Sequence, residues 1–561
     1  MKRGSMKRKD LAIFFALVTA GMLTFPARGQ FTRKIPSAHP RLVVMILVDP
    51  LSLDQLNRFQ EKMGKEGFRK LLSQGSYFNN ARYGYFFAEA ETGVATVLSG
   101  SNPVVHGIVG SNWYEPLHNE RRFATVDPSV KAVRGSYDNG QHSPRHLLTS
   151  TLGDAIRLGS RLRGRSFAVG LDASTAVLAG GHLANAVYWY DDRSGTWMSS
   201  NYYLDSLPQW VRDFNDKALP RTYLTKVWDT WLPPTEYSAS LPDSADKSEG
   251  LQGKTVFPYD LKKISHLDRR HENLAILRQT PYGNTFTEDF VTNLVVHEEL
   301  GQDDTCDFLA VVFSAGKYVL QTFGRDSREM EDLLLRLDHD VAHLLSFLER
   351  EVGRENLLVI LTATRGVSPD AQYLESLKMP AGYFNPNQAM SLLRSYLNVI
   401  YGEALWVKGY HNHQIYLDHV LIEDANISLY SMQDRVADFM LQFTGVSHVM
   451  TAHALREAGN SNPVFMKIQN GFYPKRSGDV FVVLDPGWQE KNGHQETTGA
   501  GFWYDTHVPL IWYGWRIPRK TIPQAVPMTA VAPTVSYFLK IPAPNGSDGT
   551  LLEELLEPQN K

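Results

Sequence analysis

The chain has 561 residues, of which 43% are hydrophobic and 21% are charged, as is ordinary for a globular protein. Its formal net charge of -3 shows no basic excess, which argues against a nucleic-acid partner. With Cys306 as its one cysteine, the chain cannot form an internal disulfide, so its stability must come from the core. Because Cys306 precedes an apolar run, we expect a packed thiol rather than a reactive one.

Residues 1–29 have the pattern of a cleavable signal peptide. Lysines and arginines crowd the first ten residues, an apolar run follows from Leu11 to Phe25, and the small residues Ala27 and Gly29 resemble a cleavage site. The apolar run is shorter than the ~20 residues that a spanning helix needs, so we expect cleavage after Gly29 and no membrane span thereafter. The expected location is the periplasm, with secretion or the cell surface as alternatives.

Five short apolar runs indicate strands of one α/β sheet. The first, 41–49, ends at Asp49, at the strand tip where open α/β sheets bind ligands. The others span 167–171, 308–313, 357–362 and 508–513. Apolar residues at spacings of three and four over 330–348 predict a helix, with Ser327 as N-cap and Gly353 as its stop. This strand–helix–strand order predicts a mostly parallel sheet.

Two stretches do not fit this alternation. Residues 192–270 are rich in Trp, Tyr, Pro, Ser and Asp with weak periodicity, and residues 370–475 are similarly irregular. We interpret both as insertions that cover the sheet. The predicted organisation is a signal peptide at 1–29, one domain at 30–555 that carries both insertions, and a tail at 556–561.

Several motifs follow one another between about residues 41 and 555. They include Ser99–Gly110, Leu152–Asp154, Gly180–Asn185, Pro281–Asn284 and Tyr504–Pro509. In this order they resemble the alkaline phosphatase superfamily, specifically its type I phosphodiesterase/nucleotide pyrophosphatase branch and the phosphate-irrepressible periplasmic alkaline phosphatases. The resemblance implies a three-layer α/β/α sandwich with cap insertions. It also implies two-zinc phosphoryl transfer to a Thr or Ser nucleophile at a helix N-terminus.

Most positions that this family uses for catalysis hold other residues here. Asp49 matches the first metal ligand. The nucleophile position holds Ala90, which has no hydroxyl, and Thr92 could replace it only if the register slips. The other ligand positions hold Lys317, Gln321, Thr364, Arg365 and Thr498. The family's phosphate-binding Asn, Lys and Arg are replaced by Ser111, Asp172 and Ser174.

One retained carboxylate cannot hold zinc, because zinc sites need three or four protein ligands. We therefore expect no cofactor, and we expect Asp49 to cap a turn or to pair with Lys317 or Arg365. The predicted function is an exported, catalytically inactive phosphatase-like pseudoenzyme that binds an unknown protein or envelope component. If it is active, the resemblance implies a phosphoric-ester hydrolase of the phosphatase or phosphodiesterase type.

Two alternatives stay open. The first is a divergent phosphatase or phosphodiesterase, with zinc as its cofactor, which would require four side chains to converge: Asp49, Glu91, Thr92 and His494. The second is an anion- or sugar-binding module that uses Lys317 and Arg365.

Two other pairs of candidate residues are given structural interpretations. His411 and His413 alternate along an expected strand, which would place them on one face, but a lone His pair is not usually a metal site. Glu89 and Glu91 flank Ala90, and we interpret them as solvated or capping charges.

Overall fold

The computed structural model describes residues 38–115, 120–241, 250–266, 272–457, 462–492, 495–497 and 501–556. The predicted signal peptide lies outside these ranges, as do His494, Thr498 and the tail from residue 557 onward. Within the described ranges, no helix is both long enough and apolar enough to cross a membrane.

The centre of the fold is an 11-stranded mixed sheet. In spatial order its strands are β21 (Lys520–Ile522), β2 (Ser76–Arg82), β20 (His507–Gly514), β12 (Leu357–Ala363), β1 (Leu42–Val48), β11 (Asp307–Phe313), β6 (Ser166–Gly170), β7 (Ala186–Asp191), β8 (Thr196–Ser200) and β5 (Ala132–Val133), with β22 (Val526–Pro527) pairing β2. The five predicted strands are all present in this sheet, as β1, β6, β11, β12 and β20.

The parallel part of the sheet is its most buried part. β1 lies between β11 and β12, parallel to both, and every one of its residues is at most 2% exposed. An unbroken aliphatic run suits a strand that is covered on both faces, and this explains why its sequence does not alternate. β20 runs antiparallel to β12, so the predicted mostly parallel sheet is confirmed with an antiparallel addition on that side.

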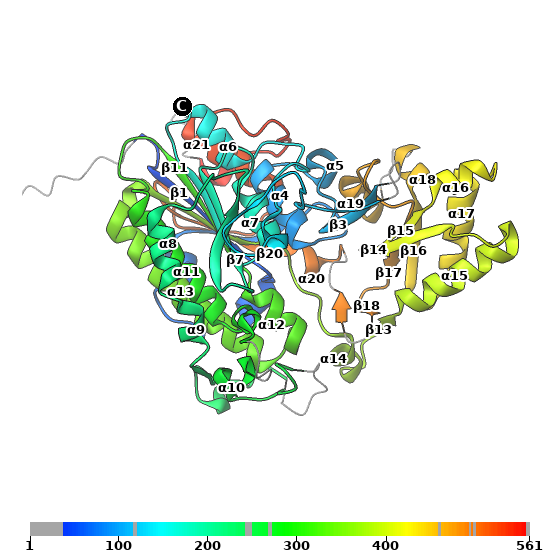
Figure 1. Cartoon of the computed structure of the whole chain (residues 1–561), viewed down its shortest axis with the longest axis horizontal. Coiled ribbons are helices and arrows are strands. Elements are labelled where there is room, and N and C mark those ends of the chain that lie inside the picture. Colours follow the sequence, from blue (N-terminus) through cyan, green and yellow to red (C-terminus); the bar gives the residue numbers. More distant parts are fainter. Residues whose placement is uncertain are drawn as a thin grey trace, which may run out of the picture. The chain divides into compact units, whose positions relative to one another are not determined.

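Helices cover both faces of the sheet, as Figure 1 shows. One group packs around β6 and β11 and comprises α4 (Ala90–Ser99), α6 (Leu152–Gly159), α7 (Ala173–Gly180) and α21 (Val531–Leu539). The other group comprises α2 (Leu53–Phe59), α3 (Phe68–Gln74), α11 (Tyr282–His297), α12 (Ala315–Phe323) and α13 (Arg328–Val352). The predicted three-layer α/β/α sandwich is therefore confirmed.

Helix α13 confirms the helix that its apolar spacing predicts. The Ser327 side chain accepts a hydrogen bond from the Met330 N–H, and Gly353 ends the helix with a φ of 84°. A hydroxyl at the N-cap satisfies a backbone donor that the first helical turn leaves unpaired, which is why these residues fix the helix boundaries.

The stretch 192–270 contributes to the main sheet as well as to its surroundings. β8 pairs antiparallel with β7 in the main sheet. Beyond β8 the described residues of this stretch form the short elements α8 (Gln209–Asp216), α9 (Leu219–Tyr223), β9 (Val227–Trp228), a 3₁₀ helix at Pro234–Glu236, β10 (Tyr259–Asp260) and α10 (Leu261–Ser265).

The described residues between 371 and 497 form a substructure with its own apolar core, which includes Leu393, Ile415 and Val482. One sheet has the order β14 (Val407–His411), β15 (Gln414–Leu417), β17 (Val480–Leu484) and β16 (Val446–Thr451), and the other has β13 (Gly382–Phe384), β18 (Trp488–Asn492) and β19 (Gln495–Thr497). The helices are α14 (Ala371–Ser376), α15 (Pro386–Tyr401), α16 (His419–Asp424), α17 (Leu429–Met440), α18 (Ala452–Glu457) and α19 (Pro463–Gly471).

Candidate functional site

The site lies where three neighbouring parallel strands end. Val48, the last residue of β1, is in register with Phe313 of β11 and with Ala363 of β12. Backbone hydrogen bonds continue one step further, from Asp49 N–H to Phe313 O at 2.9 Å and from Thr364 N–H to Val48 O at 3.0 Å. The residues that follow the strands are therefore held at one level, where the carboxyl ends of parallel strands form ligand sites.

Helix α4 points its N-terminus into the same region. Its first turn packs against the loop after β12 so closely that a Cβ on Gly93 would lie 1.7 Å from the Thr364 carbonyl oxygen. Only glycine permits this approach of helix to backbone. The packing fixes where Ala90 and Glu91, in the first turn, stand relative to the strand ends.

Asp49 is fully buried among polar partners. Its Oδ1 accepts a hydrogen bond from Thr364 Oγ1 at 3.0 Å and lies 3.5 Å from Nε of Arg365. Its Oδ2 has no hydrogen-bond partner among the described residues. A buried carboxylate needs a compensating charge, and Arg365, with 12% of its side chain exposed, supplies it.

Lys317 is the second cation of the site. It lies in the first turn of α12, after β11, with its Nζ 3.7 Å from Oδ2 of Asp172. The Asp172 carboxylate raises the pKa of Lys317 despite the opposing effect of burial, and Glu91 contributes in the same direction. Burial alone would raise the pKa of Asp172, but Lys317 and Arg278 lower it below its ordinary value. Both members of this pair are therefore ionised at neutral pH.

These residues do not fit the zinc pair that the family resemblance implies. Lys317 and Arg365 are protonated and have no lone pair to offer, Gln321 is exposed, and the Thr364 hydroxyl donates to Asp49. Across the described residues, no three His, Cys, Asp or Glu side chains are grouped so that they could hold a metal ion. The expected ligand position Thr498 lies outside those residues.

Neither candidate at the nucleophile position is suited to attack. Ala90 is the first residue of α4 and is 4% exposed. The Thr92 hydroxyl is fully buried, accepts from the Glu89 N–H at 2.9 Å and donates to the Glu89 carbonyl at 2.7 Å. The Thr92 side chain thus caps the N-terminus of its own helix.

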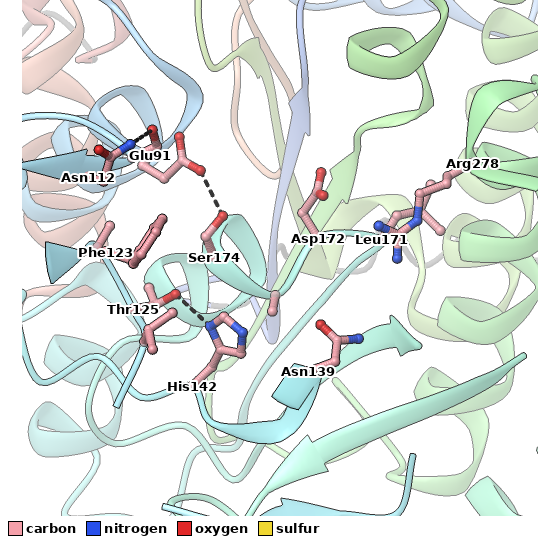
Figure 2. Close-up of a pocket in the computed structure, with 14 residues that line it drawn as sticks. Glu91, Asn112, Phe123, Thr125, Asn139, His142, Leu171, Asp172, Ser174 and Arg278 are labelled. Atoms are coloured by element: carbon pink, nitrogen blue, oxygen red, sulfur yellow. Dashed lines mark hydrogen bonds between the residues drawn. The ribbon is translucent and has the colours of Figure 1, made fainter. Parts of the chain in front are cut away.

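A cavity of about 320 Å³ lies beside these groups. Figure 2 shows the polar side chains that face it from several elements. Its lining includes Glu91 from α4, Asn112 and Phe123 from the hairpin of β3 (Asn112–Glu115) and β4 (Glu120–Phe123), Thr125, Asn139, His142, Asp172, Ser174 from α7, and Arg278. Its volume lies within the range of small-molecule sites, at about 300–1,000 Å³.

Two hydroxyl groups in the cavity are hydrogen-bonded to potential bases. Ser174 Oγ donates to Glu91 Oε1 at 2.7 Å, and Thr125 Oγ1 lies 2.9 Å from Nδ1 of His142 (Figure 2). Burial raises the pKa of Glu91, with Lys317 opposing and Glu89 adding to the effect. Burial lowers the pKa of His142 to about 4, so its imidazole is neutral at neutral pH. Glu91 is only 6% exposed, and its interpretation as a solvated charge was therefore wrong.

Arg278 brings a third positive charge. Its guanidinium donates to the Tyr318 hydroxyl and to the Tyr190 carbonyl, each at 3.1 Å, and lies 3.5 Å from Asp192 Oδ2. The carboxylates around it and the hydroxyl of Tyr318 hold the pKa of Arg278 above its ordinary value against the effect of burial. Sequence reasoning missed Arg278, because it belongs to a short 3₁₀ segment, Leu274–Gln279, that carries no recognisable motif.

The two histidines of the His-Asn-His motif do not share a strand face. β14 ends at His411 and β15 begins at Gln414, with Asn412 and His413 forming the turn at φ values of 48° and 62°. A two-residue hairpin turn requires such positive φ angles, and Asn tolerates them well. His411 Nε2 lies 3.5 Å from Glu89 Oε1, whereas His413 Nδ1 lies 3.1 Å from Glu490 Oε1. The expectation of a shared strand was wrong because the turn separates the rings.

Comparisons with known proteins show which proteins this chain is similar to. The family model described as type I phosphodiesterase / nucleotide pyrophosphatase matches residues 43–508. The chain is 33% identical to alkaline phosphatase PafA of Elizabethkingia meningoseptica over 96% of this chain and 98% of that protein. It is 32% identical to alkaline phosphatase PhoV of Synechococcus elongatus over 93% of this chain and 94% of that protein.

A solved structure shows the same fold. The crystal structure of wild-type alkaline phosphatase PafA superposes with a TM-score of 0.89 at 32% identity, covering 92% of this chain and 99% of that one.

These similarities contradict the expectation of a catalytically inactive pseudoenzyme. Relatives that are one third identical over nearly the whole chain are named alkaline phosphatases, which supports the alternative of a divergent phosphatase or phosphodiesterase. The prediction was wrong because it considered only the positions at which the family places its ligands, nucleophile and phosphate-binding side chains. It interpreted Glu91 as a solvated or capping charge, counted Ser174 only as a lost phosphate-binding residue, and missed Arg278. All three side chains line a cavity at the same end of the sheet.

Proposed function

Because this chain belongs to the type I phosphodiesterase / nucleotide pyrophosphatase family, a family of phosphoric-ester hydrolases, we propose that it hydrolyses phosphate esters in the cavity next to Asp172. The observation that carries the proposal is the placement of two cations at the cavity wall. Arg278 lines the cavity, and Lys317 Nζ lies 3.7 Å from Oδ2 of Asp172, which also lines it. Two partly buried cations beside a polar cavity favour an anionic substrate such as a phosphate ester.

The site supports a reaction in which protein cations balance the charge of the phosphoryl group. In relatives with two zinc ions, the metals clamp the attacking and leaving oxygens. Here Lys317 and Arg365 stand at strand ends where the resemblance places metal ligands. Fixed cations aimed at developing negative charge lower the barrier for the same physical reason as a metal does, because they need no reorganisation.

The test is hydrolysis of an aryl phosphate monoester and of a bis-aryl phosphate diester, each with a chelator and with added zinc. We expect turnover of at least one ester, and we expect Arg278→Gln to lower kcat/KM by about 10- to 100-fold through loss of a charge-assisted contact. Arg221→Gln is the matched control, because Arg221 pairs with Glu272 at 2.9 Å and is 58% exposed. A wild-type protein that turns over neither ester under either condition would overturn the proposal.

We further propose that the chain is exported, which rests on its N-terminal sequence alone. A basic start, a short apolar run and small residues at Ala27 and Gly29 support cleavage by a signal peptidase. Mass spectrometry of the protein purified from cell fractions should find Gln30 as the first residue in a periplasmic or extracellular fraction. A cytosolic protein that still starts at Met1 would contradict this. The predicted binding of a protein or envelope component stays a prediction.

A further inference from the structure

We infer that Ser174 is the nucleophile of this site and that Glu91 is the general base that takes its proton. The inference rests on the proposed hydrolysis of phosphate esters and names the residues that would perform it. Neither position carries this role in the family resemblance, in which position 174 holds a phosphate-binding cation and position 90 the nucleophile.

The two side chains are already arranged for proton transfer. Ser174 Oγ donates to Glu91 Oε1 at 2.7 Å, and both residues line the cavity (Figure 2). A nucleophile within hydrogen-bond reach of its base is the arrangement that activates a hydroxyl group. Ser174 is half-buried, so that its oxygen can meet a ligand, whereas Glu91 is 6% exposed and sheltered from water.

The position of each residue on its helix favours this chemistry. Ser174 is the second residue of α7 and Glu91 the second residue of α4, so both lie in the first turn of a helix. The backbone N–H groups and the dipole of a helix N-terminus stabilise negative charge, such as that of a serine oxygen losing its proton. The cations of Lys317 and Arg278 act on the neighbouring residue Asp172.

The electrostatic environment of Glu91 suits a base. Burial raises its pKa, and Lys317 limits the rise, so the carboxylate binds a proton more readily than an exposed glutamate does. A general base works best when its pKa lies near the working pH, since it then accepts the proton and can later return it.

Two threonine hydroxyl groups of the region are less suitable. Thr92 is hydrogen-bonded to the backbone of Glu89 on both sides and is fully buried. Thr125 is 1% exposed, and its partner His142, with its pKa lowered to about 4, is a weak base. Ser174 alone among these three combines partial exposure with a buried carboxylate partner.

The reaction then has two balanced steps. First, Ser174 Oγ forms a bond to phosphorus while the bond from phosphorus to the ester oxygen breaks. Glu91 takes the serine proton and passes it to solvent, and the leaving oxygen takes a proton from water. Second, water attacks the phosphoserine and the bond from phosphorus to Ser174 Oγ breaks. The proton of the attacking water reaches the serine oxygen through Glu91, and inorganic phosphate leaves.

Substitutions test the two roles. We expect Ser174→Ala and Glu91→Gln each to lower kcat by at least about 100-fold, the size of effect seen when a positioned proton-transfer group is lost. Ser194→Ala is the matched control, because Ser194 Oγ donates to Asp191 Oδ2 at 2.6 Å outside the cavity, and it should retain wild-type activity. Full activity in Ser174→Ala would overturn the inference and leave the proposed hydrolysis standing.

A second measurement separates this inference from the proposed function. A fluorophosphonate probe labels an activated serine whether or not the protein turns over a natural ester, and peptide mass spectrometry locates the label. We expect the label on Ser174 in the wild type, at least about tenfold less in Glu91→Gln, and unchanged labelling in Ser194→Ala. Absence of the label from Ser174 would overturn the nucleophile assignment. A labelled Ser174 in a protein that hydrolyses neither aryl ester would overturn the proposed function alone.

Discussion

The ammonium group of Lys317 lies 3.7 Å from the carboxylate of Asp172, and each holds the other in its charged form. In the family resemblance the charges at these two positions are reversed, with a carboxylate ligand at 317 and a phosphate-binding cation at 172. The two positions therefore carry opposite charges in both cases, with the signs exchanged. Because Lys317 and Asp172 compensate each other, the site has an internal charge balance although it no longer resembles a zinc site.

This pair predicts a strong coupling between the two positions. Lys317→Met should lower the free energy of unfolding by about 3 kcal/mol, because it leaves the Asp172 carboxylate buried without its cation. Adding Asp172→Asn should recover most of that loss, since no charge then remains to be compensated. Urea denaturation of the two single variants and the double variant measures the coupling. Strictly additive losses would show that the two side chains do not stabilise each other.

Arg365 should matter for stability because Asp49 is fully buried. We expect Arg365→Met to destabilise the fold by about 3–5 kcal/mol through the loss of the cation that faces Asp49. The matched surface substitution is Arg350→Met, since Arg350 pairs with Glu351 at 3.1 Å and is 67% exposed. It should change stability by less than about 1 kcal/mol. Equal melting temperatures for the two variants would mean that the hydrogen bond from the Thr364 hydroxyl is enough to stabilise the buried Asp49 carboxylate.

The buried carboxyl group of Asp505 should make the stability of the fold fall as the pH rises. Burial raises its pKa to about 7, although Ser368 Oγ donates to it at 2.7 Å. The folded state therefore keeps a proton that the unfolded chain releases near pH 4, so this contribution is complete below about pH 4 and is lost as the pH rises through 7. Asp505→Asn cannot ionise. From pH 4 to pH 8, its free energy of unfolding should therefore rise by about 2–4 kcal/mol relative to that of the wild type. Stability curves that stay parallel over that interval would contradict the raised pKa.

Restoring the ligand types of the family should create metal affinity. We expect the triple variant Lys317→Asp, Gln321→His, Arg365→His to bind zinc more tightly than the wild type, because it replaces two cations and an amide with zinc ligands around Asp49. Metal content after dialysis against zinc gives the stoichiometry. The single variant Gln321→His is the control, since it leaves both cations in place and should bind no more zinc than the wild type. A triple variant with wild-type zinc content would show that the strand ends cannot hold the ion in any case.

The layered fold could be predicted because its signals are local. Unbroken aliphatic runs predicted the buried strands, and Ser327 and Gly353 marked the ends of α13, since the backbone groups of helix ends need specific partners. Asp49 was placed at a strand tip by the same reasoning. The antiparallel direction of β20 was not evident, because an apolar strand of eight residues carries no mark of its direction.

Residues of the site could be predicted only where they belong to a motif or directly follow a predicted strand. Lys317 and Arg365 follow strands, so their place was foreseeable, whereas Arg278 reaches the cavity from a segment without periodicity. The burial of Glu91 depends on the packing of α4 against the Thr364 backbone, which is a tertiary contact. The turn at His413 was mistaken for a strand, because alternation over three residues cannot distinguish a strand from a hairpin loop.

The hairpin formed by β14 and β15 limits how far the chain can be shortened. Its His411 reaches Glu89 at the start of α4, and Tyr416 packs on Tyr114 with ring centroids 5.2 Å apart. An engineer who deleted residues 371–497 to obtain a minimal enzyme would thus also remove the partner of Glu89 and uncover Tyr114, both close to residues that line the cavity. Truncation would remove contacts of residues that adjoin the cavity wall, so redesign for smaller size has to begin elsewhere in the molecule.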